Sequence, residues 1–280
     1  MVEWLELRVS EEHAERVFAP SEGKRLGSVR RVRLRTNDPR LEKVEYWQRT
    51  LSQPPFFFGW DYIRRYNDAE TAGARAFLIA RVATFEPEGE SCGTVYDDRS
   101  ACVCGVPRRQ LGPLRLRVAR IPRGVHLART IAGEFVISAE LLARSNENGI
   151  SVQAASVFAP KAASPDLNWC QLDTSVADLE ISPMTRIGNG PFDADAAGQY
   201  RCPAGCVLGL NLLSELVLAG EGLDGRHVAF TRQCVGVRRG VLVPRPLMVV
   251  SPQFRAVLLK GTYARRCRLE IVHHEGDRVA

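Results

Sequence analysis

The sequence predicts an α+β fold built from short mixed sheets and a few capped helices. The composition is that of a globular protein, with 45% hydrophobic and 25% charged residues among 280, and a chain of this length buries a stable core without cross-links. Several short segments alternate apolar and polar residues, which is typical of half-buried strands. Two longer segments each read as a strand, a capped helix, a glycine and a second strand.

The N-terminal part, residues 1–85, has the pattern of a small α+β layer. Its expected elements are a strand at 4–9, a short polar helix at 11–18, a basic strand at 29–35 and a buried strand at 76–82. An aromatic run at 56–60 follows two prolines, which exclude a helix there. We expect these rings to fill the core of this part, because aromatic side chains supply the largest buried area per residue.

Basic residues outnumber acidic ones, with 38 Lys+Arg against 32 Asp+Glu, a net charge of +6 and a pI near 9.0. The densest basic stretch alternates, so Arg31, Arg33 and Arg35 share one side of a strand while Val32 and Leu34 face the core. Acidic residues are scattered among the basic ones, whereas a nucleic-acid-binding protein gathers its basic residues on one face. We therefore interpret these arginines as a solvated strand face and do not expect nucleic acid as a partner.

The rest of the chain reads as a duplication. In each copy an apolar strand runs into a serine, Ser138 or Ser251, whose side chain can accept a hydrogen bond from the free N–H groups of a helix start. Pro252 stands at the first helical position of the second copy, and Gly149 and Gly261 stand where a left-handed C-cap is wanted. Both serines are therefore predicted to be N-caps rather than nucleophiles.

This duplication divides the chain into four parts. After the N-terminal part come a first cysteine-containing unit at 86–160, a linker or long loop at 161–198, and a second cysteine-containing unit at 199–280. The linker is inferred from its prolines and from a polar run rich in glycine and aspartate, and it contains a possible strand at 170–172.

A pair of cysteines precedes each strand-helix unit. The pairs are Cys102 with Cys104 and Cys202 with Cys206. Two thiolate pairs on turns that contain Gly or Pro are how zinc ribbons assemble a tetrahedral four-sulfur site, so we expect these four residues to be zinc ligands in a structural site. Cys92 is an alternative member of the set. The competing interpretation is that the cysteines are small buried hydrophobic residues without a metal.

The eight cysteines do not indicate disulfides, because the chain starts without the basic and apolar regions of an export signal. No apolar run approaches the ~20 residues of a membrane-spanning helix. We therefore expect a cytoplasmic protein with no membrane segment.

Catalytic motifs are not recognisable. The sequence contains no H-E-x-x-H, no phosphate loop and no G-x-G-x-x-G between a strand and a helix. We assign no catalytic residue and expect that the protein is not an enzyme. One exposed turn is a candidate partner-binding site, because Arg238 and Arg239 lie between two glycines and can engage carboxylates of a partner protein.

The cysteine pairs and helix starts together resemble the myxobacterial family of paralogous double-CXXCG proteins and, more distantly, immunity proteins of polymorphic toxin systems. The likeness covers roughly residues 92–275 and rests on Cys102 to Gly105, on Cys202 to Cys206, and on the serines at 138 and 251. It implies a bacterial, cytoplasmic, non-catalytic protein that binds and neutralises a cognate toxin. Two alternatives stay open: a zinc-ribbon-type nucleic-acid-binding protein and an enzyme of unrecognised type.

Overall fold

A computed structural model describes residues 1–99, 102–106, 108–175, 177–220 and 222–277. The chain forms two compact units, unit 1 (Met1–Gly73 with Gly190–Asp193) and unit 2 (Ala74–Asn189 with Ala194–Ala280). Helices make up 16% and strands 37%, which confirms the predicted α+β class. None of the helices in the described ranges combines the length and the apolar character that crossing a membrane requires.

Unit 1 is an antiparallel sheet in the order β2-β3-β1-β4, with short helices beside it. Its elements are β1 (Val2–Ser10), α1 (Glu11–Ala14), β2 (Lys24–Leu26), β3 (Val29–Arg35), α2 (Arg40–Thr50), β4 (Phe57–Arg65) and α3 (Asp68–Gly73). As the alternation predicts, Arg31, Arg33 and Arg35 are exposed while Val32 and Leu34 are buried. The aromatic run contributes Phe56 and Phe57 to the core of this unit, as expected, because both rings are buried there.

Unit 2 contains two runs of elements, which we name repeat 1 (residues 76–158) and repeat 2 (residues 165–189 and 194–274). Repeat 1 comprises β5 (Ala76–Arg81), β6 (Ala83–Phe85), η1 (Glu90–Cys92), β7 (Tyr96–Asp97), β8 (Arg109–Gln110), β9 (Leu114–Arg115), η2 (Val118–Arg120), β10 (Leu127–Thr130), β11 (Phe135–Ser138), α4 (Ala139–Glu147) and β12 (Ala154–Phe158). Repeat 2 comprises β13 (Pro165–Leu172), β14 (Ala177–Leu179), β15 (Ile187–Gly188), β16 (Asn211–Leu212), β17 (Leu216–Leu218), β18 (Val228–Val235), β19 (Arg245–Val250), α5 (Pro252–Leu259) and β20 (Arg268–His274). Apart from η1 and η2, the two runs follow the same order of strands and helix.

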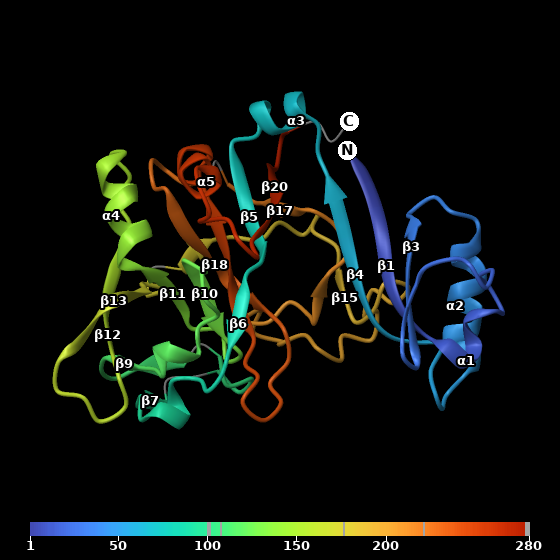
Figure 1. Cartoon of the computed structure of the whole chain (residues 1–280), viewed down its shortest axis with the longest axis horizontal. Helices are drawn as coiled ribbons and strands as arrows, with labels where there is room; N and C mark the ends of the chain where they lie inside the picture. Colours follow the sequence, from blue (N-terminus) through green and yellow to red (C-terminus); the bar gives the residue numbers. More distant parts are fainter. Residues whose placement is uncertain (100–101, 107, 176, 221, 278–280) are drawn as a thin grey trace. The chain divides into compact units, whose positions relative to one another are not determined.

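The two repeats exchange their first strands. One six-stranded sheet has the order β6-β10-β11-β13-β12-β9 and the other β14-β18-β19-β5-β20-β17. Strand β13 of repeat 2 therefore lies between β11 and β12 of repeat 1, and β5 of repeat 1 lies between β19 and β20 of repeat 2 (Figure 1). Because each sheet is completed by a strand from the other repeat, neither repeat has a complete sheet of its own.

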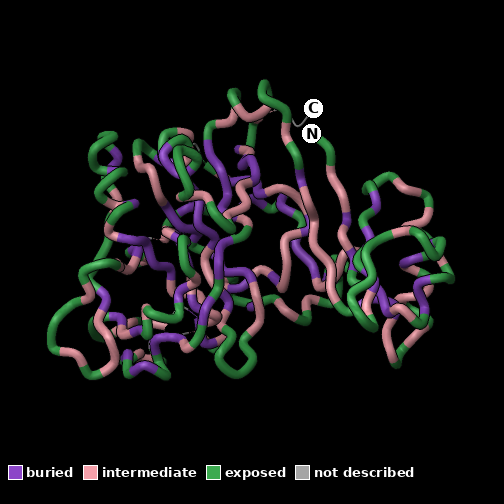
Figure 2. Tube along the Cα trace, in the orientation of Figure 1, coloured by how far each residue is buried: buried purple, intermediate pink, exposed green. Residues whose placement is uncertain are grey.

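Pairing registers show that the duplication is residue by residue. Leu114 of β9 pairs with Val157 of β12, and at the same places in repeat 2 Leu216 pairs with Val272. The edge strands β6 and β14 both run parallel to the first strand of the following hairpin. In both repeats the residues of the central strands are largely buried, as the purple stretches of Figure 2 show. The duplication inferred from two sequence segments therefore extends through unit 2.

Side-chain hydrogen bonds repeat as well. Thr94 Oγ1 accepts from the backbone N–H of Arg115 at 2.8 Å, and in repeat 2 Thr185 Oγ1 accepts from that of Val217 at 2.9 Å. Each bond ties the segment before a cysteine turn to the edge strand that follows it. The threonines are buried, so these bonds satisfy backbone groups that water does not reach.

The predicted serine caps are present. Ser138 Oγ accepts from the N–H of Leu141 at the start of α4, and Ser251 Oγ accepts from the N–H of Phe254 at the start of α5, both at 3.1 Å. A histidine accompanies each cap, and the local sequence pattern of a cap does not predict it. Nδ1 of His126 lies 3.0 Å from Ser138 Oγ. Nδ1 of His227 lies 2.9 Å from Ser251 Oγ.

The structural division differs from the division expected from sequence in two places. Unit 1 continues only to Gly73, because β5 and β6 pair with strands of unit 2. The segment 161–198 contains β13, β14 and β15, so it contributes strands to three sheets and is not only a linker. Strand β13 confirms the possible strand at 170–172 and begins earlier, at Pro165. It has only one buried residue, Leu172, and therefore lacks the alternation that would predict its full length from the sequence.

Candidate metal centre

Two short turns carry the cysteine pairs, and both turns have the same backbone frame. The N–H of Gly105 donates to the carbonyl of Cys102 at 2.6 Å, and the N–H of Gly205 donates to that of Cys202 at 2.9 Å. Both glycines are left-handed, with φ of +75° and +76°, a conformation that side chains disfavour. The second cysteine of the pair precedes the glycine in repeat 1 and follows it in repeat 2, which explains the unequal spacing of the two pairs.

Each turn is closed by a valine and framed by a two-stranded sheet. The N–H of Cys102 donates to Val106 O at 3.4 Å, and the N–H of Cys202 donates to Val207 O at 2.8 Å. Strands β7 and β8 flank the first turn, and β15 and β16 flank the second, with matching antiparallel registers. The strands of each repeat thus present one cysteine turn.

The two turns bring four thiols together. The Sγ atoms of Cys102, Cys104, Cys202 and Cys206 all lie within 4.8 Å of one another, and Cys102 Sγ is 3.5 Å from Cys202 Sγ. In a tetrahedral site with metal–sulfur bonds of ~2.3 Å, the sulfurs are about 3.8 Å apart. The spacing of the four thiols therefore fits a single metal ion held jointly by both repeats.

The surroundings of the thiols are apolar. Cys202 is buried, the other three cysteines are half-buried, and Val106 and Val207 pack in the same cluster. This packing restricts access of water to the thiols and holds both turns together.

The ionisation of the thiols is strongly uneven. Burial opposes the ionisation of Cys202, but hydrogen bonds from the backbone N–H of Ala204 and from neighbouring thiols outweigh it and lower the pKa of Cys202 to about 7. Burial and the adjacent thiols raise the pKa of Cys206 to about 12. Burial also raises the pKa of Cys104. Without a cation the cluster resists a second negative charge, whereas a divalent cation favours the thiolate form of every ligand.

The remaining cysteines do not complete the site. Cys92, the alternative member, lies at the end of η1 outside the four-thiol group, and its pKa is raised by burial. Cys234 belongs to the same apolar cluster and donates its N–H to Cys206 O at 2.8 Å. Burial raises the pKa of the Cys234 thiol to about 12. Cys234 supports the second turn through its backbone, a role that its isolated position in the sequence did not reveal.

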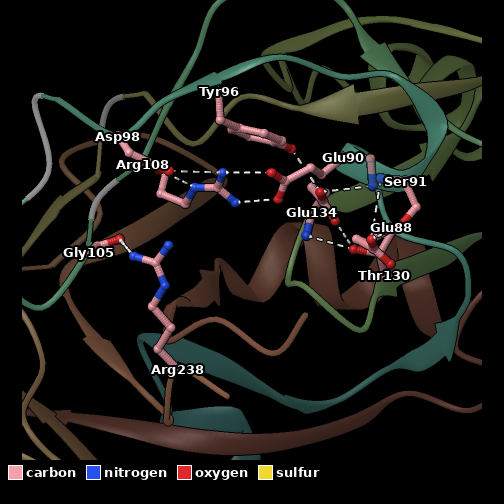
Figure 3. A network of polar contacts seen from close by, with 11 residues as sticks. Glu88, Glu90, Ser91, Tyr96, Asp98, Gly105, Arg108, Thr130, Glu134 and Arg238 are labelled. Carbon is pink, nitrogen blue, oxygen red and sulfur yellow. Dashed lines mark hydrogen bonds and ion pairs between the residues drawn. The ribbon is translucent and has the colours of Figure 1, made fainter. Parts of the chain in front are cut away.

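A polar network fastens the loop that holds the first turn (Figure 3). Arg108 binds Asp98 through Nε at 2.6 Å and Glu90 through Nη1 at 2.8 Å. Its guanidinium also stacks on the ring of Tyr96, 4.7 Å from the centroid. Asp98 precedes Cys102 and Cys104 in the chain, and Arg108 follows them. The ion pairs of Arg108, which we call the Arg108 clamp, therefore join the two ends of the loop that carries these cysteines.

The network continues to a half-buried carboxylate. Tyr96 Oη donates to Glu134 Oε1 at 2.8 Å, Gly89 N–H donates to the same oxygen at 3.1 Å, and Thr130 donates to the second oxygen. Burial raises the pKa of Glu134 despite these donors, and burial followed by the charge of Glu134 raises the pKa of Tyr96. Separate positions in the sequence give no signal for such a network, since its members are spread over β7, β10 and the loops at Gly89 and Glu134.

The two arginines predicted to bind a partner lie on the exposed turn between β18 and β19. Arg238 is exposed and its Nη1 donates to Gly105 O at 3.4 Å, so it joins this turn to the first cysteine turn (Figure 3). Arg239 is exposed and forms a tight turn with Leu242 through two backbone hydrogen bonds of 3.1 and 3.0 Å. Arg238 thus has a contact inside the molecule, and Arg239 presents its side chain to solvent.

No protein-family model matches the chain, and neither a curated protein nor a solved structure matches it. The assignment of a function therefore rests on the geometry above and on the residues that carry it.

Proposed function

We propose that the protein is a non-catalytic interaction protein whose unit 2 is held together by one structural zinc ion. The observation that carries this proposal is the group of four thiols, two from each repeat, within 4.8 Å of one another. Four thiolates fill a tetrahedral zinc site and leave no position for water, which is the arrangement of structural rather than catalytic zinc. Soft thiolate donors favour zinc over magnesium or calcium.

The chain's own residues determine where the ligands stand. Gly105 and Gly205 set the two turns, the Arg108 clamp closes the first loop, and Cys234 supports the second turn. Zinc supplies the positive charge that lets all four thiols ionise together. Because metal binding requires the folded arrangement of both turns, the free energy of binding adds to the stability of unit 2.

The partner we propose is a protein, in keeping with the resemblance to immunity proteins that bind and neutralise a cognate toxin. Large apolar side chains are exposed on the loops at the metal centre. Val103, at the tip of the first cysteine turn, is 96% exposed, and Val241 and Leu242 are exposed on the turn that carries Arg238. Exposed apolar side chains next to arginines are typical of interaction surfaces. The net charge of +6 favours an acidic partner.

The structural role of zinc is tested by thermal unfolding with and without a strong chelator. We expect the chelator to lower Tm. We also expect all four thiols to react with a thiol reagent after metal removal, at temperatures at which the protein is still folded. An unchanged Tm after complete metal removal would contradict a structural role.

The interaction is tested with the protein encoded by the adjacent gene, by coexpression and by binding of the purified pair. We expect a stable complex, relief of growth inhibition, and at least about tenfold weaker binding for Val103→Asp, because a charge at an interface centre is desolvated without a partner. The matched control is Leu167→Asp, since Leu167 is 84% exposed on β13. Equal effects of both substitutions, or steeply salt-dependent binding to DNA or RNA with no protein complex, would contradict the proposal.

A further inference from the structure

Two arginines of unit 2 lack a partner of opposite charge. Arg129 on β10 and Arg245 on β19 are half-buried, and within the described ranges neither guanidinium makes a hydrogen bond or an ion pair with another side chain. Arg108, by contrast, is held by two carboxylates. A guanidinium withdrawn from water without a counter-charge is costly to the fold.

The sheet registers place Arg129 in the interior of unit 2. Arg129 lies directly opposite Phe135 on the neighbouring strand, and directly opposite side chains share a face of the sheet. The ring of Phe135 packs against that of Phe230 in the other six-stranded sheet, with centroids 5.5 Å apart. Arg129 therefore stands on the face that is turned toward the other sheet.

Arg245, the first residue of β19, lies close to the turn between β10 and β11, and β10 carries Arg129. A Cβ built on Gly133, between β10 and β11, would be only 3.2 Å from the Cβ of Arg245. Burial and the positive charge of Arg245 lower the pKa of Arg129 to about 9, and burial lowers the pKa of Arg245. Both side chains are partly withdrawn from water, and the positive charge of Arg245 disfavours the charged form of Arg129.

Comparison of the repeats shows that the fold does not need a charge here. The N–H of Glu134 donates to Thr130 Oγ1 at 3.3 Å, and the N–H of Leu247 donates to Thr231 Oγ1 at 2.8 Å, so these threonines are equivalent. The residue before each threonine is Arg129 in repeat 1 and a buried Phe230 in repeat 2. An aromatic ring fills this position in repeat 2, so packing alone does not require an arginine at the same place in repeat 1.

We propose that Arg129 and Arg245 form a binding site for the oxyanion group of a small molecule, a phosphate or a carboxylate. A guanidinium presents paired N–H donors that match either group bidentately. An anion between the two arginines supplies the counter-charge that the protein lacks there and removes their repulsion. Neither arginine belongs to the four-thiol group. Because Arg245 lies near Cys234 of the same apolar cluster, metal content is measured beside anion binding in each variant.

The experiment measures Tm and isothermal binding in the metal-loaded protein with inorganic phosphate, citrate or chloride at matched ionic strength. We expect phosphate or citrate, but not chloride, to raise Tm in a saturable way, and the stronger of the two identifies the class of ligand. Arg129→Met and Arg245→Met should each weaken binding about tenfold to hundredfold, as loss of a charge-assisted contact does. The matched control is Arg123→Met, since Arg123 is exposed in the same repeat.

A second pair of readouts separates binding from folding. Without ligand, Arg129→Met should have a higher Tm than the wild type, because it removes a buried unpaired charge. Arg129→Lys should fold like the wild type and bind the anion more weakly, because lysine keeps the positive charge but lacks the paired N–H donors of the guanidinium group. The proposal is overturned by a wild type that does not respond to either anion, or by equal responses in all variants. Loss of bound metal in the variants without any change in anion binding would also overturn it, since the arginines would then serve the thiolates.

Discussion

At the scale of single residues, two serines combine a helix cap with a histidine contact. Ser138 accepts from the N–H of Leu141 and touches Nδ1 of His126, and Ser251 does the same with Phe254 and His227. Each serine also donates its backbone N–H to the carbonyl of its histidine. Each serine therefore fixes the start of its helix and, through its histidine, the start of the strand that opens the preceding hairpin, β10 or β18.

We expect Ser138→Ala and Ser251→Ala each to lower the free energy of unfolding by about 1 kcal/mol, the usual cost of a lost N-cap. Urea unfolding at neutral pH measures this. The control is Ser151→Ala, since Ser151 is exposed. A loss at only one of the two serines would contradict their equivalence.

The half-buried His273 on β20 predicts a pH-dependent stability of unit 2. Nε2 of His273 lies 3.2 Å from Glu215 Oε2, and this carboxylate raises the pKa of His273. The resulting stability is complete below the unfolded pKa of about 6.5 and is lost as the pH rises through the higher folded value. Partial exposure limits it to less than about 1 kcal/mol.

Phe158 stands at the equivalent position of repeat 1, since Arg115 pairs with Phe158 as Val217 pairs with His273. We therefore expect His273→Phe to remove this pH dependence, measured by urea unfolding across the neutral range. Glu215→Gln should have the same effect. A wild-type stability that rises from weakly acidic to weakly alkaline pH in step with His273 titration would contradict the assignment.

At the scale of elements, the two cysteine turns share a backbone and differ in their neighbours. A Cβ on Gly105 would fall 1.6 Å from Arg238 Nη1, whereas a Cβ on Gly205 would meet nothing within 4 Å. Both positions impose the left-handed strain of about 1–2 kcal/mol on an alanine. We expect Gly105→Ala to lower the free energy of unfolding more than Gly205→Ala does, because the new methyl group must displace the Arg238 side chain.

A double-mutant cycle measures that cost. In an Arg238→Ala background, Gly105→Ala should be as destabilising as Gly205→Ala, because only the backbone strain remains. Equal effects of Gly105→Ala with and without Arg238 would show that the arginine does not rest on this turn.

The elements differ in how clearly the sequence predicts them. Ser138 and Ser251 are recognisable because an N-cap has a local sequence pattern. Strand β3 is recognisable because its apolar and basic residues alternate. Only the end of β13, residues 170–172, is recognisable as a possible strand. Its position between β11 and β12 has no local signal, since it depends on pairing with a distant part of the chain. Four cysteines were correctly singled out as neighbours, while Cys234 and the Tyr96–Glu134 contact carry no local signal.

At the scale of the whole molecule, the exchanged strands couple the two halves of unit 2. Leu78 belongs to repeat 1 but packs in the core of the sheet of repeat 2. We expect Leu78→Ala to cost about 2–5 kcal/mol and to accelerate amide exchange in both six-stranded sheets, because neither sheet is complete alone. Acceleration confined to the sheet that contains β5 would contradict this coupling.

The central claim is that the two repeats hold one metal ion between them. The direct test is zinc content by inductively coupled plasma mass spectrometry on the wild type, on Cys102→Ser, on Cys202→Ser and on the control Cys267→Ser. The account predicts one zinc per chain in the wild type and the control, and loss of zinc when either turn loses its first cysteine. Absence of zinc from the wild type, or its retention at full content in both single variants, would contradict it.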